Sequence, residues 1–548
     1  MSVVGTTGGG TGRSPRGGGF THPIAFWTGA LTSTAGVFLH LPMYFGSRDM
    51  GYHMAGMAPD APMVIGMVMI VVGLGLSFYG VVPRAGRSIS RNARRISVRA
   101  LDDAPLRAPH VALALAMALA VTIDVMKPTA LAFVAPGMAA EYGLRSPANP
   151  HGDVPVSWLP LFGITGTVLG SFLWGWLGDR IGRRASIIMA GMLFVTTSIC
   201  GTMPGFGWNL VMCLVMGMSA GGMLPIAFTL LAETIPSKHR GWLMVLIGGD
   251  IAGAYVITSW LAGWLTPTYS WRVLWLVGLP SGLVFIALNR WIPESPRFLL
   301  ASGRQAEAEQ VMARYGAVAR EIPEQEVEPG REVDRGGTFL LFRRPLVGPT
   351  TAITVLGLGI GLMTYGFQLW VPTNLRQLGY SAINSDYVVR NAALIGLPLT
   401  VLTAWLYGVW GSRRTIVATS AVTGLTLLGF VVAGDQLAHD RTLLSLLLVV
   451  PLSGVSSVVA VVISYAAEVY PTLVRSRATG FAAGMTKAGG VLILALTVAT
   501  ATVPSLAGTA LLGAVPLLAA ALAFLWIGPE TRSRRLEDIS DQLVPGRP

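Results

Sequence analysis

The chain has 548 residues, of which 52% are hydrophobic and 12% are charged, and its formal net charge is +12 at pH 7. Soluble globular proteins carry about 25% charged residues, so this composition excludes an ordinary soluble domain and is typical of a polytopic membrane protein. The arginines cluster in short segments beside apolar runs, which indicates membrane topology rather than a nucleic-acid partner. The two cysteines, Cys200 and Cys213, lie inside apolar runs, so no disulfide framework is expected.

The apolar runs predict fourteen membrane-spanning helices, because each run approaches the roughly 20 residues that cross a bilayer. They are too long and too apolar for the strands of a transmembrane barrel. We therefore predict an all-α membrane protein. Its spans are expected near residues 22–45, 61–83, 108–136, 156–177, 185–204, 208–234, 241–265, 271–292, 346–371, 386–409, 415–434, 442–468, 476–500 and 504–528.

The polar segments divide the chain into seven parts. Residues 84–107 hold seven arginines and two aspartates, which places this segment and both termini on the cytoplasmic side. The Glu-rich stretch within residues 293–345 indicates a solvated loop. The predicted parts are a flexible tail (1–21), a transmembrane hairpin (22–83), a basic linker (84–107), a six-helix half (108–292), a cytoplasmic loop (293–345), a second six-helix half (346–528) and a cytoplasmic tail (529–548).

The polar segment inside the hairpin is rich in methionine. Met50, His53, Met54 and Met57 follow an i, i+3, i+4, i+7 spacing, so on a helix they would share one face. Thioether and imidazole groups suit Cu(I), which makes metal handling one hypothesis. Methionine also fills irregular apolar gaps, so we favour a hairpin that packs against the core or a partner without a metal.

The last twelve spans contain an internal repeat of two six-helix halves. "AETIPSKHRG" is echoed by "AEVYPTLVRSRATG", "PESPR" by "PETRS" and "GWLGDRIGRR" by "LYGVWGSRR". The matched pairs have nearly one spacing and keep one order: Glu233 and Glu468 are 235 residues apart, Pro293 and Pro529 are 236 apart, and Arg183 and Arg413 are 230 apart. Two such halves predict a transporter whose halves rock about a site near the middle of the bilayer.

These motifs resemble those of the major facilitator superfamily over roughly residues 108–535. "GWLGDRIGRR" resembles the signature loop between the second and third helices of that superfamily. "PESPRFL" and "PETR" resemble its sugar, organic-ion and metabolite:proton symporter branches. "YGFQLWVPTNLRQLGY" is similar to the seventh helix of bacterial aromatic-acid and nicotinate-type symporters. The early hairpin is an addition to the common pattern.

The resemblance implies a cytoplasmic gate in which loop charges latch the halves together. Glycines permit a tight turn, and Asp179 near helix ends can accept backbone N–H groups. We expect Glu233 to pair with Arg240, and Glu468 with Arg475 or Arg477. The second loop copy lacks the Asp-Arg pair, so the latch should be stronger on the first half. The full candidate set is Gly175, Gly178, Asp179, Arg180, Gly182, Arg183, Arg184, Glu233, Arg240, Glu468, Arg475 and Arg477. A role of these charges in topology alone is the alternative.

Three charged residues within the first half are candidates for proton coupling, since ionisable groups inside spans are functional sites by default. Asp124 and Lys127 are three residues apart on one helix, and Pro128 follows them. We predict that Asp124 carries the proton and Lys127 modulates it, with a purely structural ion pair as the alternative. Asp250 follows two glycines and is expected either to carry a second proton or to line a polar pocket. The Asp-Gly-x-Asp form common in aromatic-acid carriers is absent, which weakens a claim of aromatic-acid specificity.

The second half supplies the candidate substrate-binding residues. Lys487 lies in "RATGFAAGMTKAGG", which resembles the eleventh helix of organic-ion carriers, where a cation implies an anionic substrate. Pairing of Lys487 with Asp124 or Asp250 is the alternative. Tyr365 and Gln368 are spaced to share a helix face and could contact a small organic molecule. Trp370 and Arg390 complete the set, although packing and an interfacial belt are the stronger explanation for Trp370.

The sequence thus predicts a proton-coupled secondary transporter of a small, carboxylate-type anion in the cytoplasmic membrane. The alternatives are a proton-driven exporter of drug-like compounds and a non-transporting receptor or assembly protein on the same scaffold. No nucleotide loop, nucleophile motif or catalytic metal set is visible, so neither an enzyme nor a cofactor is expected. The expected partners are the substrate, protons and the lipid bilayer.

Overall fold

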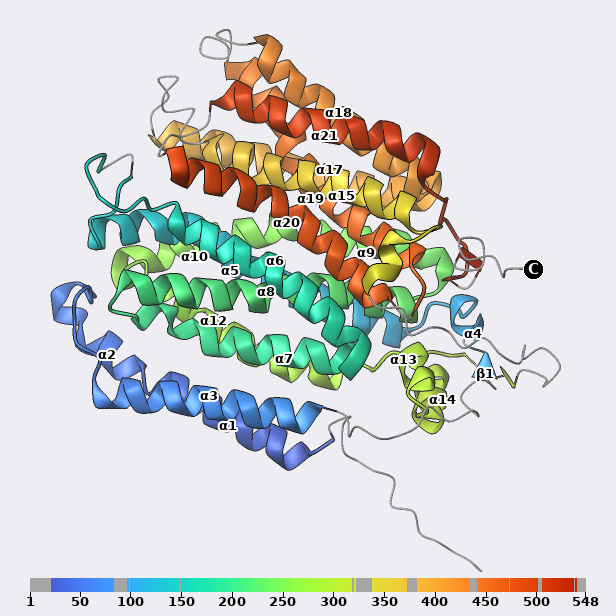
Figure 1. Ribbon diagram of the computed structural model, residues 1–548, viewed down its shortest axis with the longest axis horizontal. Coiled ribbons are helices and arrows are strands. Elements are labelled where there is room, and N and C mark those ends of the chain that lie inside the picture. Colours follow the sequence, from blue (N-terminus) through green and yellow to red (C-terminus); the bar gives the residue numbers. More distant parts are fainter. Residues whose placement is uncertain are drawn as a thin grey trace, which may run out of the picture.

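The computed structural model describes residues 21–82, 96–97, 99–146, 149–317, 320–321, 338–371, 382–433, 441–472, 474–500, 505–536 and 538–539. Within these ranges thirteen helices are long and apolar enough to cross a membrane. Helix α17 (Ala382–Trp410) occupies the position of the remaining expected span. The prediction of an all-α protein with fourteen spans is confirmed, and the long helices run roughly along one direction (Figure 1).

The N-terminal hairpin is held together by small residues. It comprises α1 (Pro23–Phe38), α2 (Leu41–Gly46), the 3-10 helix η1 (Arg48–Met50) and α3 (Ala61–Val81). A Cβ atom on Gly29 would lie 2.5 Å from the backbone nitrogen of Ser77, so α1 and α3 approach closely there. Both helices contact α7 (Arg183–Thr196) and lie along one flank of the bundle (Figure 1).

The outer loop of the hairpin does not form the helix that the metal hypothesis requires. After η1 the chain turns at Gly51 and Tyr52, and no helix is assigned between residues 51 and 60. Met54 is fully buried, whereas Met50 is 54% exposed. The backbone N–H of Met54 donates to Glu141 of the first half. The methionines therefore do not share one helical face, and the copper hypothesis loses its structural basis.

The first half begins with one continuous helix that passes through two prolines. Helix α5 (Ala108–Glu141) includes Pro128 and Pro136, each of which removes a main-chain hydrogen bond. The next spans end or restart at glycines, as at Gly182 between α6 and α7. The remaining elements are α6 (Trp158–Ile181), α7, η3 (Thr197–Thr202), α8 (Phe206–Thr234), α9 (Ser237–Gly248), α10 (Ile251–Tyr269), α11 (Val273–Leu276), α12 (Gly278–Ala287) and η4 (Leu288–Arg290).

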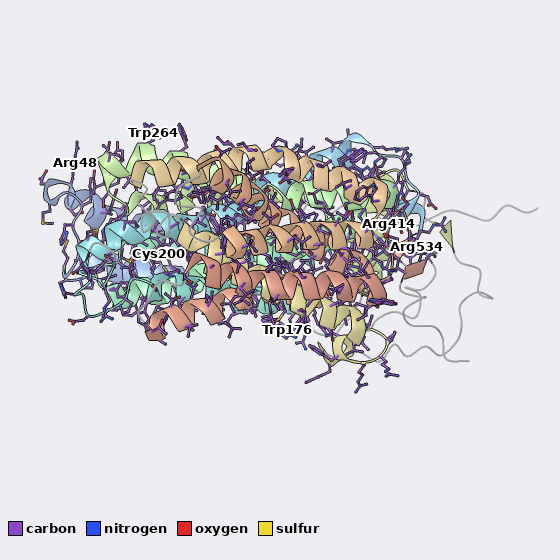
Figure 2. All side chains as sticks on the ribbon, turned by 90° about the horizontal axis from the view of Figure 1, so that it is seen from above. Arg48, Trp176, Cys200, Trp264, Arg414 and Arg534 are labelled. Atoms are coloured by element: carbon purple, nitrogen blue, oxygen red, sulfur yellow. The ribbon has the colours of Figure 1, made fainter. Side chains whose placement is uncertain are left out.

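Short elements gather at one end of the bundle, which also holds the C-terminal tail (Figure 1). We call this the inner end, because the arginine-rich linker predicts that it faces the cytoplasm. Arg414 and Arg534 lie near it, and Arg48 of the hairpin loop lies at the opposite, outer end (Figure 2). The short elements are α4 (Arg99–Asp102), α13 (Pro296–Ala301), α14 (Gln305–Arg314), η6 (Thr338–Phe342) and the strands β1 (Ile96–Ser97) and β2 (Arg320–Glu321), which pair antiparallel.

The second half repeats the arrangement of the first and interrupts one helix at a predicted site. Helix α15 (Val347–Leu362) continues into a π turn, η7 (Met363–Phe367), and a 3-10 turn, η8 (Gln368–Trp370). Such π turns occur frequently at functional sites. The other helices are α17, α18 (Ser412–Ala433), α19 (Arg441–Val469), α20 (Arg475–Thr500) and α21 (Leu506–Ile527).

Several helix pairs join the halves, and two contacts are the most extensive. Helix α6 packs against α20, and α9 packs against α17 and α19. At the first contact a Cβ atom on Gly175 would lie 2.6 Å from the carbonyl oxygen of Ser476. Glycine is required there because the two backbones approach so closely. Asp179 and Arg477 meet at the first contact, and Arg240 and Glu468 meet at the second.

Candidate functional site

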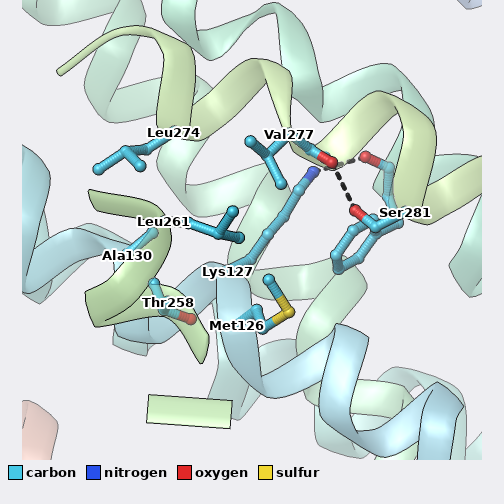
Figure 3. Close-up of a pocket in the computed structure, with 10 residues that line it drawn as sticks. Met126, Lys127, Ala130, Thr258, Leu261, Leu274, Val277 and Ser281 are labelled. Carbon is cyan, nitrogen blue, oxygen red and sulfur yellow. Dashed lines mark hydrogen bonds between the residues drawn. The ribbon is translucent and has the colours of Figure 1, made fainter. Parts of the chain in front are cut away.

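Lys127 does not form the ion pair with Asp124 that its spacing suggested. Its Nζ lies 2.5 Å from the carbonyl oxygen of Phe194 (Figure 3). It also lies 2.7 Å from Thr197 Oγ1. The Phe194 carbonyl belongs to the last turn of α7, where the helix dipole favours a cation, and it also accepts a hydrogen bond from Thr197 Oγ1. The adjoining cavity, lined by Ser281 among others, has a volume of about 20 Å³. That volume suits roughly one water molecule and excludes an organic substrate.

Asp124 lies in a different environment, facing the second half. Only 4% of its surface is exposed. Within the described residues its carboxylate has neither a hydrogen-bond partner nor an ion pair. The cation that acts most strongly on its charge is Lys487, and Lys127 comes second. Lys487 projects from α20, and its Nζ lies 3.5 Å from Ser171 Oγ on α6. The structure therefore places a buried carboxylate of one half and a partly buried ammonium of the other near each other, without a direct ion pair between them.

Asp250 lies apart from both Lys127 and Asp124. It occupies the break between α9 and α10, as its two preceding glycines suggested, but its side chain does not cap α10. Its carboxylate instead accepts a hydrogen bond from Thr122 of α5. Thr122 and Asp124 are two residues apart, so they project from opposite sides of the helix. Asp250 lines a mostly apolar groove of about 880 Å³ formed by α5, α9 and α17. The three predicted proton-coupling residues thus lie at three distinct places.

The candidate residues of the seventh core helix lie close to Lys487. The Tyr365 ring packs over Gly490, which is one helical turn from Lys487 on α20. Tyr365 belongs to the π turn and Gln368 begins the 3-10 turn, and both side chains are partly exposed. The side chains of Trp370 and Arg390 lie outside the described part of the structure. The described residues therefore bring Tyr365 and Lys487 into one region of the second half.

Asp179 links the halves at the inner end. Its carboxylate accepts the backbone N–H groups of Ser476 at 3.3 Å and Arg477 at 3.2 Å. It also forms ion pairs with Arg183 at 3.4 Å and Arg477 at 3.5 Å. Ser476 and Arg477 belong to the first turn of α20, where the helix dipole favours a negative charge. A carboxylate of the first half thus caps a helix of the second half.

Each glutamate of the gate forms an ion pair across the halves, which corrects the predicted partners. Glu233 bonds to Arg183 of its own half, and also to Arg475 of the second half at 2.9 Å. Glu468 bonds to Arg240 of the first half at 3.2 Å. Each repeat therefore supplies a glutamate to the other repeat's arginine. All these side chains are buried, and the pairs join the two halves at the inner end.

Four of the motif residues play other parts than expected. Gly175 and Gly178 lie inside α6 and allow close packing against α20, so Gly182, with a φ of +103°, makes the turn alone. Arg180 is exposed and stacks over the Trp176 ring at 4.1 Å, with no ion pair among the described residues. Arg184 donates to Asn289 within the first half at 2.8 Å. Arg180 and Arg184 therefore do not join the halves.

The "PESPR" and "PETRS" motifs play equivalent roles in the two halves. Glu294 accepts the backbone N–H of Arg183 at 2.8 Å, and Glu530 accepts that of Ser412 at 2.8 Å. Each glutamate therefore caps the helix that follows a signature loop. Burial raises the pKa of Glu294. The repeat seen in the sequence is thus a repeat of helix caps at the inner end.

A second buried ion pair holds the outer end of the first half. Arg272 Nη2 lies 2.5 Å from Glu141 Oε1 and also donates to the Tyr142 hydroxyl. The same carboxylate accepts the backbone N–H groups of Met54 at 2.8 Å and Ala55 at 3.0 Å. The hairpin loop is therefore fastened to a charged cluster of the core.

The most informative residue that sequence reasoning missed is Asp102. It belongs to the arginine-rich linker, whose charges were assigned only to topology. Asp102 is buried and forms ion pairs with Arg240 at 3.0 Å and Arg297 at 2.7 Å. Arg297 ends the "PESPR" motif. The signal available in the sequence was an aspartate among arginines, just before the first helix of the repeat.

Comparison with known proteins agrees with this architecture. A family model described as "Sugar (and other) transporter" matches residues 132–543. The niacin transporter NiaP of Acinetobacter baylyi is 25% identical over 450 residues, covering 81% of this chain and 99% of that protein. The 4-hydroxybenzoate transporter PcaK of the same organism is 25% identical over 404 residues, covering 71% of this chain and 85% of PcaK.

A solved structure shows the same fold. The proton:xylose symporter XylE bound to 6-bromo-6-deoxy-D-glucose has a TM-score of 0.66 at 18% identity, covering 79% of this chain and 99% of XylE. Two six-helix halves, latched by charges at one end, define an integral membrane transporter rather than an enzyme. The chain belongs to the sugar (and other) transporter family, within the major facilitator superfamily.

Proposed function

We propose that this protein couples proton movement to the transport of a small organic carboxylate across the bacterial inner membrane. The observation that carries the proposal is the placement of the buried Asp124 and the partly buried Lys487 between the halves, with no direct ion pair between them among the described contacts. A charge in a bilayer interior is retained where it serves substrate or proton movement. Relatives that transport niacin and 4-hydroxybenzoate, both small carboxylic acids, support a carboxylate substrate.

The two charges suggest how anion and proton binding are coupled. A substrate carboxylate entering between the halves would bind the Lys487 ammonium, because a cation attracts the anion strongly where water is scarce. Lys487 would then act less on Asp124, and a carboxylate that loses a neighbouring cation binds a proton more readily. The bound proton would offset the charge of the bound anion, so the loaded cavity would carry no added net charge, which eases the passage of the halves through the occluded state.

The surrounding side chains fit a small ring-bearing anion. Tyr365 lies over Gly490 and can present its ring face to a planar substrate. Gln368 is partly exposed and can donate or accept a hydrogen bond. In this proposal the substrate contacts neither Lys127 nor Asp250. Lys127 is enclosed beside a cavity of about 20 Å³, and Asp250 lines the groove of about 880 Å³ between α5, α9 and α17.

The charged contacts of the inner gate would control whether the transporter is open to the outside or to the inside. Closure rests on Asp179 capping α20 and on the Glu233–Arg475 and Arg240–Glu468 pairs. We assign this end to the cytoplasm, since the arginine-rich linker and tail lie there. In this state the substrate would enter from the outer side, and release inside requires these pairs to separate.

The test is ligand-dependent thermal stabilisation of the purified protein at two pH values on either side of neutrality. Nicotinate and 4-hydroxybenzoate are compared with neutral nicotinamide and with an organic cation. We expect the carboxylates to stabilise the protein, and Lys487→Met to abolish that effect. Lys127→Met is the matched control and should retain it. Stabilisation by cations alone would reject the carboxylate hypothesis and favour a drug-like exporter.

A further inference from the structure

The segment that joins the hairpin to the first half enters the inner gate. We propose that Asp102 is a working part of this gate, which keeps Arg240 paired when Glu468 withdraws and thereby sets how readily the inner end opens. The proposal rests on alternating access of the two halves. It does not depend on the substrate or on proton coupling.

Within the linker, Asp102 is fastened to the first half. Asp102 Oδ1 lies 3.0 Å from Arg240 Nη1, and Oδ2 lies 2.7 Å from Arg297 Nη2. The Asp102 backbone oxygen accepts a hydrogen bond from Ser237 Oγ at 3.0 Å. Leu101 beside it is buried. Ser237 and Arg240 begin α9 and Arg297 lies on α13, so all these bonds attach the linker to one side of the gate.

Arg240 is shared between the two sides. Its Nε lies 3.2 Å from Glu468 Oε1, and its Nη2 donates to the backbone oxygen of Arg534 at 2.8 Å. Both acceptors belong to the second half or to the tail that follows it. Among the described residues Asp102 is the one partner of the Arg240 side chain that comes from outside the second half and its tail. The side chain of Arg240 is fully buried.

The equivalent arginine of the second half is supported differently. Arg475 bonds to the backbone oxygen of Tyr470 at 3.2 Å and to Thr472 Oγ1 at 3.0 Å, besides its pair with Glu233 across the gate. These two supporting groups belong to its own half. The first half has no such support for Arg240 within its own described helices, and the linker carboxylate fills that place.

The shared arginine makes the energetic role of Asp102 asymmetric between the two states. With the gate closed, Arg240 has two carboxylates, and with the gate open it keeps Asp102. The first carboxylate beside a buried cation contributes more than the second, because an unpaired buried charge is the costly case. Removing Asp102 therefore penalises the open state more than the closed state.

The test measures the gate directly and without substrate. Spin labels on Lys238→Cys and Arg414→Cys, two exposed positions at the inner ends of the two halves, report closed and open distances. Asp102→Asn should lower the ratio of open to closed protein by about fivefold or more. Asp103→Asn is the matched control, since Asp103 pairs with Arg535 at the surface, and it should change the ratio less than twofold. An unchanged or higher open ratio in Asp102→Asn would overturn the proposal.

A double-variant comparison separates the proposed role from simple loss of a contact. In the Glu468→Gln background Arg240 keeps the same carboxylate in both states, so adding Asp102→Asn should not lower the open ratio further. An equal fall in both backgrounds contradicts the shared-arginine mechanism.

A second measurement holds even if Asp102→Asn fails to fold. Labels on Asp103→Cys and Lys238→Cys should keep one distance in closed and open protein, because the linker stays with α9. A distance that changes as the gate opens would show that the linker follows the second half, and would refute the proposal. Neither result tests the carboxylate hypothesis, so either proposal can be refuted while the other stands.

Discussion

Replacing Asp179 by Asn should release the inner gate. The substitution removes the negative charge that faces Arg183 and Arg477 and leaves one amide oxygen to accept a single backbone N–H of α20. Arg183 keeps its pair with Glu233, so the first half should remain folded. The lost contacts are mainly those that cross between the halves, and the change should therefore favour the open state over the closed state.

The size of the effect follows from these contacts. A side chain that caps a helix contributes about 1 kcal/mol. The pair with Arg477, which is long at 3.5 Å and partly exposed, contributes about 1 kcal/mol at most. Together they stabilise closure by about 2 kcal/mol, which corresponds to roughly a 30-fold change in the ratio of open to closed protein.

A cysteine at Thr479 reports this change. Thr479 is fully buried, and its hydroxyl lies 2.8 Å from that of Thr229 in the first half, so a thiol there reacts only when the gate opens. In inside-out vesicles the alkylation rate by a membrane-impermeant maleimide should rise at least tenfold in Asp179→Asn. Arg180→Gln, a neighbouring change with no contact between the halves, should leave it unaltered. Equal rates in the wild type and in Asp179→Asn would refute the gate mechanism.

Three further predictions concern stability. Arg272→Met leaves the Glu141 carboxylate buried without its cation and should lower the thermal unfolding midpoint by several degrees, since breaking one side of a buried pair costs about 3–5 kcal/mol; an unchanged midpoint would exclude a stabilising outer cluster. Lys127→Met replaces a buried ammonium by an apolar group of similar length. Chemical denaturation should show a change of no more than about 1 kcal/mol in the free energy of unfolding, and a loss of several kcal/mol would mean that the ammonium is structurally essential. Gly29→Leu should separate α1 from α3 and speed proteolysis of the hairpin loop, while Thr479→Cys labelling stays constant; equal proteolysis rates would contradict close packing there.

The fold was largely predictable because its signals are local. Apolar runs of bilayer length define the fourteen spans, and paired motifs such as those around Glu233 and Glu468 reveal the twofold repeat. The residues that gather at the inner end were also predictable from the signature loop. Their partners were not, because the sequence shows which charges exist but not which half supplies each neighbour. Glu233 and Glu468 both bond across the halves, a feature of the tertiary arrangement.

The charged residues inside the membrane show most clearly what could not be predicted from the sequence. Asp124 and Lys127 have the spacing of a helical ion pair, yet Lys127 bonds to a main-chain carbonyl at the end of α7. That acceptor has no signature in the sequence, since any residue supplies a carbonyl oxygen. Asp102 was overlooked for a related reason. A lone aspartate among arginines resembles a topology signal until the helix ends that surround it are placed.

The most direct test of proton-coupled carboxylate transport is uptake by proteoliposomes under an imposed proton gradient. The radiolabelled substrate is whichever carboxylate stabilises the purified protein. In the wild type, uptake should rise when the outside is acidic. In Asp124→Asn the gradient should no longer drive accumulation, although exchange of internal for external substrate continues. Full gradient-driven uptake by Asp124→Asn would contradict the assignment of Asp124 as the proton site.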